Sequence, residues 1–454
     1  MPYIPHSQKD IDDMLDTIGI EHIDDLFDEI PQAIRAQGLN RVPEALTEME
    51  LGQVMQQHAK RDDDYVCFMG AGAYEHHIPA AVWDIALRGE YLTAYTPYQA
   101  EASQGTLQLI YEFQSNIVNL TGLYAANASL YDGASGVAEA VLMAVRANRK
   151  AKSRRVLVAG TLHPRYRQVV HSIVESQNIE IVEFEYDHSK GIIDLEVLKP
   201  YADESFAALI VQHPNFFGNL EAVDSLTDWA HSHNALLVAV ANPLSLTLLK
   251  PMNEWGETGA DIAVGDGQPF GIPMASGGPY YGYMACTKAL VRQMPGRIIG
   301  KTIDLDGKTG YTLTLQAREQ HIRRAKATSN ICTNQGLAVT ASTVHMALLG
   351  AEGLGRVASA CIKNTQKLVN ELTKIAGVEL VFNGPRFHEA VIRLPQNSKS
   401  VLSALTERQI LGGYDLAVTF PELENCILVC ATEMRTDADI EHYSSTLADI
   451  LAVN

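Results

Sequence analysis

The fold is decided by three short apolar runs, FAALIVQ (206–212), ALLVAV (235–240) and DIAVGDG (261–267). Two similar runs, VLVAG (156–160) and IEIVEFEY (179–186), precede them, and segments with helical patterns separate the runs. Apolar strands that alternate with helices are typical of a mostly parallel sheet covered by helices on both faces. The sequence therefore predicts an α/β fold.

The length of the chain predicts more than one domain. Its 454 residues exceed the roughly 250 to 300 residues at which a single hydrophobic core stops growing. Hydrophobic residues at 46% and charged residues at 20% are close to globular averages. We predict an N-terminal helical arm (1–61), a large α/β domain (62–330) and a smaller C-terminal α/β domain (331–454).

Local patterns support the two outer segments. Ser7 and Asp10 resemble a capping box, and residues 11, 14, 15 and 18 are apolar at the spacing of one helical face. A long helical stretch follows Asn334, and then come short strand candidates, VELVF (378–382), EAVIRL (389–394) and CILVCAT (426–432). These patterns indicate a helical arm at one end and a second, smaller sheet at the other.

The net charge argues against several classes of partner. Thirty-five basic and 54 acidic residues leave a charge of −19, which repels phosphate backbones and anionic lipid surfaces. The start of the chain lacks a basic region followed by an apolar one, and the most apolar stretch (235–249) is interrupted by Asn242, Pro243 and Ser245. We expect a cytosolic (cytoplasmic) protein with no nucleic-acid or membrane partner.

The cysteines predict no metal site. The six cysteines are scattered, without a CxxC pair or a nearby histidine cluster. Cys426 and Cys430 are four residues apart in a β-rich run, and this even spacing places both on one face of a buried strand. Reduced thiols are therefore expected.

Functional residues are sought where the predicted parallel strands end, because ligands bind at the carboxyl edge of such sheets. The candidates there are Thr161 to Pro164, His213 to Asn215, Asn242 and Gln268. His163 and His213 have the chemistry to stack on a ring or to act as acid or base. Most histidines at loop starts do neither, and the residues alone leave both alternatives open.

Two turn-rich segments precede predicted helices, and a third lies between strands. Residues 132–136 (DGASG) and 96–99 (TPYQ) offer free N–H groups for a phosphate, although every helix has such a start. The glycines in 265–269 and 277–279 are explained by tight turns. The polar cluster Arg318 to Arg324 fits either a solvated helix face or a contact between domains or subunits.

Five segments of the chain carry a family resemblance. They are FMGAGAYEHHIPA (68–80), YTPYQAEASQGTLQLIYEFQ (95–114), NASLYDGASGVAEA (127–140), DIAVGDGQPFGIPMASGGPYYGYMA (261–285) and REQHIRRAKATSNICTNQ (318–335). These segments resemble the glycine decarboxylase family, the P-proteins of the glycine cleavage system. The resemblance covers essentially the whole chain and corresponds to the first (alpha, N-terminal) of the two homologous halves that make up such an enzyme.

The resemblance implies a fold-type I pyridoxal-phosphate-transferase-like architecture with active sites between subunits. It also implies an α₂β₂ heterotetramer with a homologous second (beta) subunit. The complex would use pyridoxal phosphate to decarboxylate glycine and would transfer the aminomethyl group to the lipoyl arm of H-protein. The enzyme would be glycine dehydrogenase (aminomethyl-transferring, decarboxylating), an oxidoreductase of glycine catabolism.

At two positions this chain departs from the family pattern for cofactor binding. Such enzymes need a lysine for the internal aldimine and a carboxylate that keeps the pyridine nitrogen protonated. The resemblance places Gln268 at the lysine position and Asn242 at the carboxylate position. A carboxamide condenses with no aldehyde, so we expect no catalytic residue and no covalently bound cofactor in this chain, and pyridoxal phosphate on the partner subunit.

The remaining candidates are residues that would face the partner. Tyr95, Tyr98, Gln99 and Glu101 are the substrate-side candidates. The interface candidates are Arg318, His321 and Arg323. All of them have an alternative as ordinary turn or capping residues. Two alternatives to the whole interpretation are an independent pyridoxal-phosphate-dependent transferase or lyase that uses another lysine, and a purely regulatory binding protein.

Overall fold

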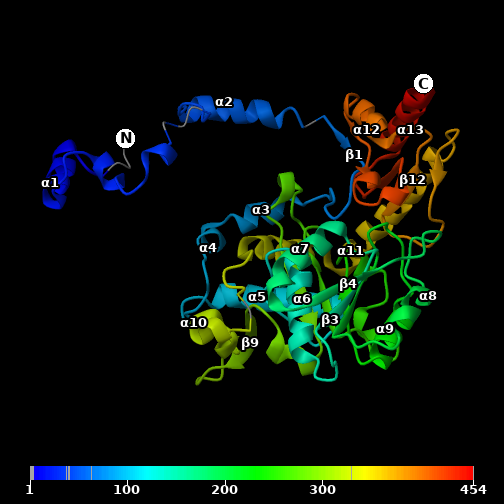
Figure 1. Cartoon of the computed structure of the whole chain (residues 1–454), viewed down its shortest axis with the longest axis horizontal. Helices are drawn as coiled ribbons and strands as arrows, with labels where there is room; N and C mark the ends of the chain where they lie inside the picture. The colour runs from blue at the N-terminus through cyan, green and yellow to red at the C-terminus, as the bar shows by residue number, and fades with distance from the viewer. Residues whose placement is uncertain (1–4, 37, 39–40, 63, 329, 453–454) are drawn as a thin grey trace. The chain divides into compact units, whose positions relative to one another are not determined.

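The chain forms two compact units, Met1–Asp64 and Tyr65–Asn454, in a computed structural model (Figure 1). The structure describes residues 5–36, 38, 41–62, 64–328 and 330–452. The predicted end of the arm at residue 61 is close to the division between the units. The predicted division at 330/331 falls inside the second unit, which is compact as a whole, and it stays a prediction.

The first unit consists of short helices without a core of their own. They are α1 (Gln8–Ile18), η1 (Ile23–Phe27), η2 (Gln32–Ile34) and α2 (Glu48–Ala59). The capping box predicted at α1 is confirmed, because Asp10 accepts a hydrogen bond from the Ser7 N–H at 2.7 Å and the Ser7 hydroxyl accepts one from the Asp10 N–H. None of these four elements contains a buried residue.

A seven-stranded sheet organises the second unit, in the order β2-β8-β7-β6-β5-β3-β4. The strands from β7 to β4 in this order are parallel, and β8 is antiparallel to both of its neighbours. The predicted apolar runs form these five parallel strands. The strands are β2 (Ala125–Ala126), β3 (Arg155–Ala159), β4 (Glu180–Phe184), β5 (Ala208–Gln212), β6 (Leu236–Val240), β7 (Ile262–Asp266) and β8 (Gly282–Cys286).

Helices cover both faces of this sheet, because alternate side chains of each strand point to opposite sides. Leu209 and Leu237 belong to a core shared with α5 and α9. Ile210 and Val238 belong to a second core, shared with α6 and α7. These helices are α5 (Gln104–Thr121), α6 (Gly133–Ala147), α7 (Pro164–Val174) and α9 (Val223–Ser232).

A smaller antiparallel sheet follows in sequence, in the order β11-β12-β15-β14. It packs against α12 and α13, and Figure 1 shows these helices together with β12 at one end of the unit. Every residue of β15 is buried, which confirms the buried strand predicted from Cys426 and Cys430. The elements are β11 (Glu379–Leu380), β12 (Glu389–Arg393), α12 (Ser398–Thr406), β14 (Tyr414–Asp415), β15 (Cys426–Cys430) and α13 (Asp437–Ala452).

The long helix α11 (Gly336–Leu372) connects the two sheets. Its first part contributes Ala338 and Met346 to the core of the large sheet, and its last turns contribute Leu368 and Leu372 to the core of the small one. Among the described residues it is the one helix long and apolar enough to cross a membrane, but half of its apolar window is buried in the protein. The helix α11 packs against α3 and α5, and this packing in the core explains its apolar composition.

The remaining elements complete the second unit. Strand β1 pairs parallel with β13, and β9 forms an antiparallel hairpin with β10. Their bounds are β1 (Val66–Cys67), α3 (Ala80–Ala86), α4 (Gly89–Leu92), α8 (Leu195–Leu198), β9 (Ile298–Ile303), β10 (Thr309–Thr314), α10 (Gln320–Arg323) and β13 (Ile410–Leu411).

Candidate functional site

The carboxyl ends of β3, β6 and β7 meet at one edge of the large sheet, where His163, Asn242 and Gln268 follow them. His163 and Asn242 line a cavity of only about 30 Å³ there. This volume holds about two water molecules, whereas small-molecule sites measure roughly 300–1,000 Å³. None of the described residues that line the cavity is a lysine. The edge predicted to hold ligands is therefore nearly closed in this chain.

Gln268 lies beside the cavity and bonds to the backbone of a remote segment that includes the lining residue Tyr74. Its carboxamide oxygen accepts a hydrogen bond from the Tyr74 N–H at 2.9 Å, and its nitrogen donates to the carbonyls of Tyr74 and Ile272 at 2.8 Å each. The side chain is 1% exposed. The carboxamide oxygen and both N–H groups of the amide are hydrogen-bonded, so Gln268 holds the segment around Tyr74 against the sheet edge.

The side-chain oxygen and nitrogen of Asn242 also contact neutral groups. Its oxygen accepts a hydrogen bond from the Leu244 N–H at 3.0 Å, and its nitrogen lies 3.2 Å from Nε2 of His388. Burial holds the pKa of His388 well below its usual value, so that ring is neutral and its Nε2 accepts the bond. This pair carries no charge that would stabilise a pyridinium.

The start of α6, a predicted phosphate site, is filled by carboxylates. Asp132 accepts a hydrogen bond from the Ser135 N–H at 2.7 Å, and Asp266 accepts one from the Gly133 N–H at 3.0 Å. Asp266 also accepts from the Gln268 N–H. Burial raises the pKa of Asp266 to about 7. Two acidic side chains occupy the donors that a phosphate would need, so the structure does not support a phosphate site at residues 132–136.

The two candidate histidines, His163 and His213, form hydrogen bonds with backbone groups. Nε2 of His163 donates to the Ala71 carbonyl at 2.8 Å, and its Nδ1 accepts from the Arg165 N–H. Nδ1 of His213 accepts from the Glu221 N–H at 3.0 Å. Burial lowers the pKa of each ring to about 4. Both rings are neutral and bonded to the backbone, and these contacts favour a structural role over acid or base chemistry.

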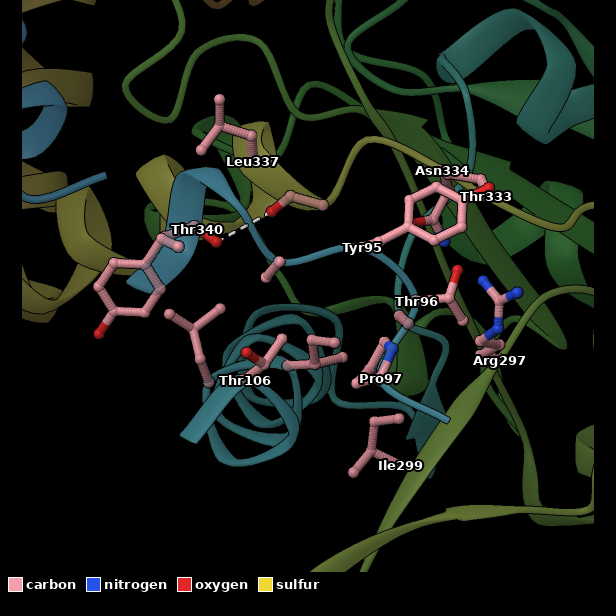
Figure 2. A pocket seen from close by; sticks show the side chains of 16 residues that line it. Tyr95, Thr96, Pro97, Thr106, Arg297, Ile299, Thr333, Asn334, Leu337 and Thr340 are labelled. Atoms are coloured by element: carbon pink, nitrogen blue, oxygen red, sulfur yellow. Dashed lines mark hydrogen bonds between the residues drawn. The ribbon is translucent and has the colours of Figure 1, made fainter. Parts of the chain in front are cut away.

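A second, larger pocket of about 150 Å³ lies between the Tyr95–Pro97 segment, Arg297 and the start of α11 (Figure 2). Tyr95 is 79% exposed, and its hydroxyl lies 2.9 Å from that of Thr333. Apolar side chains such as Leu109 and Ile299 form the floor, and several threonines line the pocket. Its volume is below the roughly 300–1,000 Å³ of small-molecule sites, although apolar walls with a few polar groups are the usual lining of such sites.

Arg297 joins the segments around this pocket. Its guanidinium donates to the Cys332 carbonyl and, at 2.9 Å, to the Tyr98 hydroxyl, and it lies 5.1 Å from the centre of the Tyr98 ring. Glu319 approaches it at 3.7 Å and is also 3.5 Å from His321. Arg297 is 5% exposed. A buried arginine with this many contacts fixes the geometry of the three segments.

Comparison with known proteins shows the family. Residues 1–447 match the family model of the glycine cleavage system P-protein. The chain belongs to the glycine cleavage system P-protein family. Proteins called probable glycine dehydrogenase (decarboxylating) subunit 1 are similar to it. The one from Nitrosospira multiformis is 59% identical over 451 residues, and the one from Legionella pneumophila strain Corby is 57% identical over 452 residues. These similarities cover 99% or more of the chain and 99% of either relative.

Solved structures agree with this P-protein assignment. A crystal structure of glycine decarboxylase (P-protein) of the glycine cleavage system, in inhibitor-bound form, has 40% sequence identity and a TM-score of 0.87, and covers 99% of this chain and 100% of that one. A sphingosine-1-phosphate lyase from Burkholderia pseudomallei shares the fold at 15% identity and a TM-score of 0.67, covering 93% and 94%. The predicted family and the fold-type I architecture are confirmed.

The structure brings only some of the predicted partner-facing residues of this P-protein together. Tyr95 lines the larger pocket, while Tyr98 contacts Arg297 and packs edge-on against His321 at 5.2 Å. Gln99 and Glu101 are exposed and do not line the pocket.

Two arginines predicted for the interface of this P-protein bond to nearby backbone. Arg318 donates to the carbonyls of Met294 and Gly296, and Arg323 donates to that of Ala317. These contacts serve the local fold, and the role of both arginines at an interface stays a prediction.

The sequence reasoning missed Arg297, which organises the pocket. Arg297 directly precedes the β-branched run of β9, and a single charged residue at that place in the sequence predicts only an ordinary strand end. Thr333 was part of a quoted motif but was not chosen as a site residue. The signal that would have found both is their contact with Tyr95 and Tyr98, more than 190 residues earlier in the chain.

Proposed function

We propose that this chain is the non-catalytic first subunit of a two-subunit glycine decarboxylase. The complex decarboxylates glycine and transfers its aminomethyl group to the lipoyl arm of H-protein. Relatives called subunit 1, aligned over nearly the whole chain, support a partnership with a second subunit. The proposed assembly has two copies of each subunit.

One observation carries the non-catalytic role, namely the closure of the sheet edge in this chain. Fold relatives use pyridoxal phosphate, and one is a C-DES variant with glycine covalently linked to that cofactor. Here the space is about 30 Å³, the helix donors bind Asp132 and Asp266, and Gln268 is bonded to Tyr74 and Ile272. These residues do not fit the cofactor, so we assign pyridoxal phosphate to the partner subunit.

The larger pocket is the proposed contribution of this chain to the shared active site. The pocket is lined by the exposed Tyr95, by several threonines and by the buried Arg297. A neighbouring subunit that docks here would cover Tyr95 and meet polar groups held in place by Arg297. We propose Tyr95 and Tyr98 as residues that face the partner's site, with His321 supporting Tyr98.

Reductive trapping tests the proposal. The co-expressed complex, dialysed to stoichiometric pyridoxal phosphate, is treated with borohydride and digested, and the phosphopyridoxyl peptide is located by mass spectrometry. We expect the label on a lysine of the partner, because Gln268 has no amine to condense with the aldehyde. A single dominant labelled lysine in this chain, lost when glycine is added before reduction, would favour the independent enzyme and overturn the proposal.

A further inference from the structure

Three side chains of metal-binding type meet in the second unit, close to the cavity at the sheet edge, where the ring of the lining residue Tyr74 is 6.3 Å from that of His76. They are His76, after β1; Cys361, in the second half of α11; and Glu433, after β15. Their ligand atoms all lie within 4.8 Å of one another. Nδ1 of His76 is 2.8 Å from Oε2 of Glu433, and the Cys361 thiol donates to the same oxygen at 3.3 Å. The His76 side chain is only 4% exposed.

The arrangement is close to the dimensions of a tetrahedral zinc site. Zinc lies about 2.0–2.3 Å from its nitrogen, oxygen and sulfur ligands, which puts neighbouring ligand atoms about 3.4–3.7 Å apart. The two distances to the Glu433 oxygen are somewhat shorter. Small movements of the side chains would therefore make room for the ion, without a change in the backbone.

The surroundings hold the ligands in place. The other carboxylate oxygen of Glu433 accepts a hydrogen bond from the His77 N–H at 2.7 Å. Such outer contacts orient metal ligands and are part of most metal sites.

We propose that His76, Cys361 and Glu433 bind one zinc ion per chain. A set of one sulfur, one nitrogen and one oxygen donor favours zinc over magnesium or calcium, which take oxygen ligands. Binding replaces the two hydrogen bonds to Glu433 by metal bonds: the Cys361 proton leaves to solvent, and the neutral His76 ring changes to the tautomer with its proton on Nε2, which frees Nδ1 for the ion. No oxidant or reductant is needed. A water molecule would supply the fourth position.

The ion would connect three segments that are far apart in sequence. His76 follows directly on the segment that Gln268 holds through Tyr74. Glu433 follows β15, and Cys361 belongs to the helix that connects the two sheets. Bound zinc would therefore stabilise the closed sheet edge together with the small sheet. The alternative is a metal-free cluster in which the same three side chains simply hydrogen-bond to one another.

Cobalt titration distinguishes these alternatives. The full-length chain, stripped with EDTA, is titrated with Co²⁺ and followed by absorbance. We expect a thiolate-to-cobalt charge-transfer band and tetrahedral d–d bands that saturate at one ion per chain. Cys361→Ala should abolish the charge-transfer band, whereas Cys426→Ala, which removes another buried thiol outside the cluster, should keep it. The absence of the band, or its persistence in Cys361→Ala, would overturn the proposal.

A second variant keeps the test decisive if Cys361→Ala does not fold. Glu433→Gln preserves shape and removes the anionic ligand. It should weaken zinc binding by more than the roughly 10- to 100-fold that loss of an outer contact causes, measured by competition with a zinc indicator. Zinc should also raise the Tm of the stripped wild-type chain. Unchanged affinity in Glu433→Gln, with no change of Tm in the wild type, would leave only the hydrogen-bonded cluster.

Discussion

Single side chains at the sheet edge show how the protein's own groups fill the space where the parallel strands end. The carboxamide of Gln268 forms hydrogen bonds with three backbone groups, and the carboxylate of Asp266 accepts hydrogen bonds from two backbone N–H groups. Unpaired buried donors are costly, so a cavity without a ligand needs such internal partners. These side chains occupy donors and space that a cofactor would otherwise require.

The raised pKa of Asp266 makes a prediction about pH. Burial raises the pKa of the folded carboxyl to about 7, whereas the unfolded one keeps its ordinary pKa of 3.8. Between these values the folded state binds the extra proton, so stability falls as the pH rises from about 4 to about 7. Asp266→Asn should flatten this fall in urea unfolding measured across that range. Asp203→Asn, at an exposed position, should leave it unchanged. Equal pH profiles for Asp266→Asn and wild type would contradict the assignment.

At the scale of elements, α11 depends on one glycine. Gly350 has φ 61° and ψ −178° inside an otherwise helical run, a conformation essentially restricted to glycine. The part before the break packs on the large sheet, and the part after it contributes Leu354, Ala358 and Cys361 to the same core before it reaches the small sheet. The change of backbone direction therefore lies within the stretch that packs on the large sheet.

Two glycines of α11 give a matched comparison. Gly350→Ala should destabilise the protein by about 1–3 kcal/mol, because the added Cβ disfavours the backbone conformation, although nothing lies within 4 Å of it. Gly355→Ala, in helical backbone with equally open space, should stabilise by roughly 0.5–1 kcal/mol. Urea unfolding of both variants measures the difference. Similar effects at the two positions would mean that the break at Gly350 is not required.

At the scale of the whole molecule, the two pockets have opposite characters. The sheet edge leaves only about 30 Å³ among the protein's own groups, while the pocket around Arg297 is larger and is lined by the exposed Tyr95. Under the proposed function, the larger pocket suits a role beside a partner's active site. Arg297 connects the segments that form this pocket.

Arg297→Lys should therefore impair the complex more than the fold. Lysine keeps the charge but loses the planar set of donors, and loss of a charged hydrogen bond worth about 1.5–3 kcal/mol predicts about a tenfold or larger fall in subunit affinity or in kcat/KM. Light scattering of mixtures with the partner and an assay of glycine decarboxylation measure these effects. Arg149→Lys, at an exposed position, is the control. Wild-type assembly and turnover in Arg297→Lys would exclude the pocket from the shared site.

Sequence alone determined the α/β fold, the five parallel strands, the capping box of α1, the buried strand at Cys426–Cys430 and the family. These features depend on local periodicity or on long contiguous motifs, which survive in one dimension. The same reasoning placed Asn242 and Gln268 at the carboxyl edge, because a parallel sheet has only one such edge.

Only the tertiary structure decided what that edge contains. Gln268 meets Tyr74, Arg297 meets Tyr98, and Glu433 meets Cys361 and His76 across long stretches of sequence. No spacing rule encodes these contacts, because packing of helices and sheets brings the segments together independently of their separation along the chain. The sequence predicted which ligand-binding groups are replaced, and the fold shows which of the protein's own groups surround those positions.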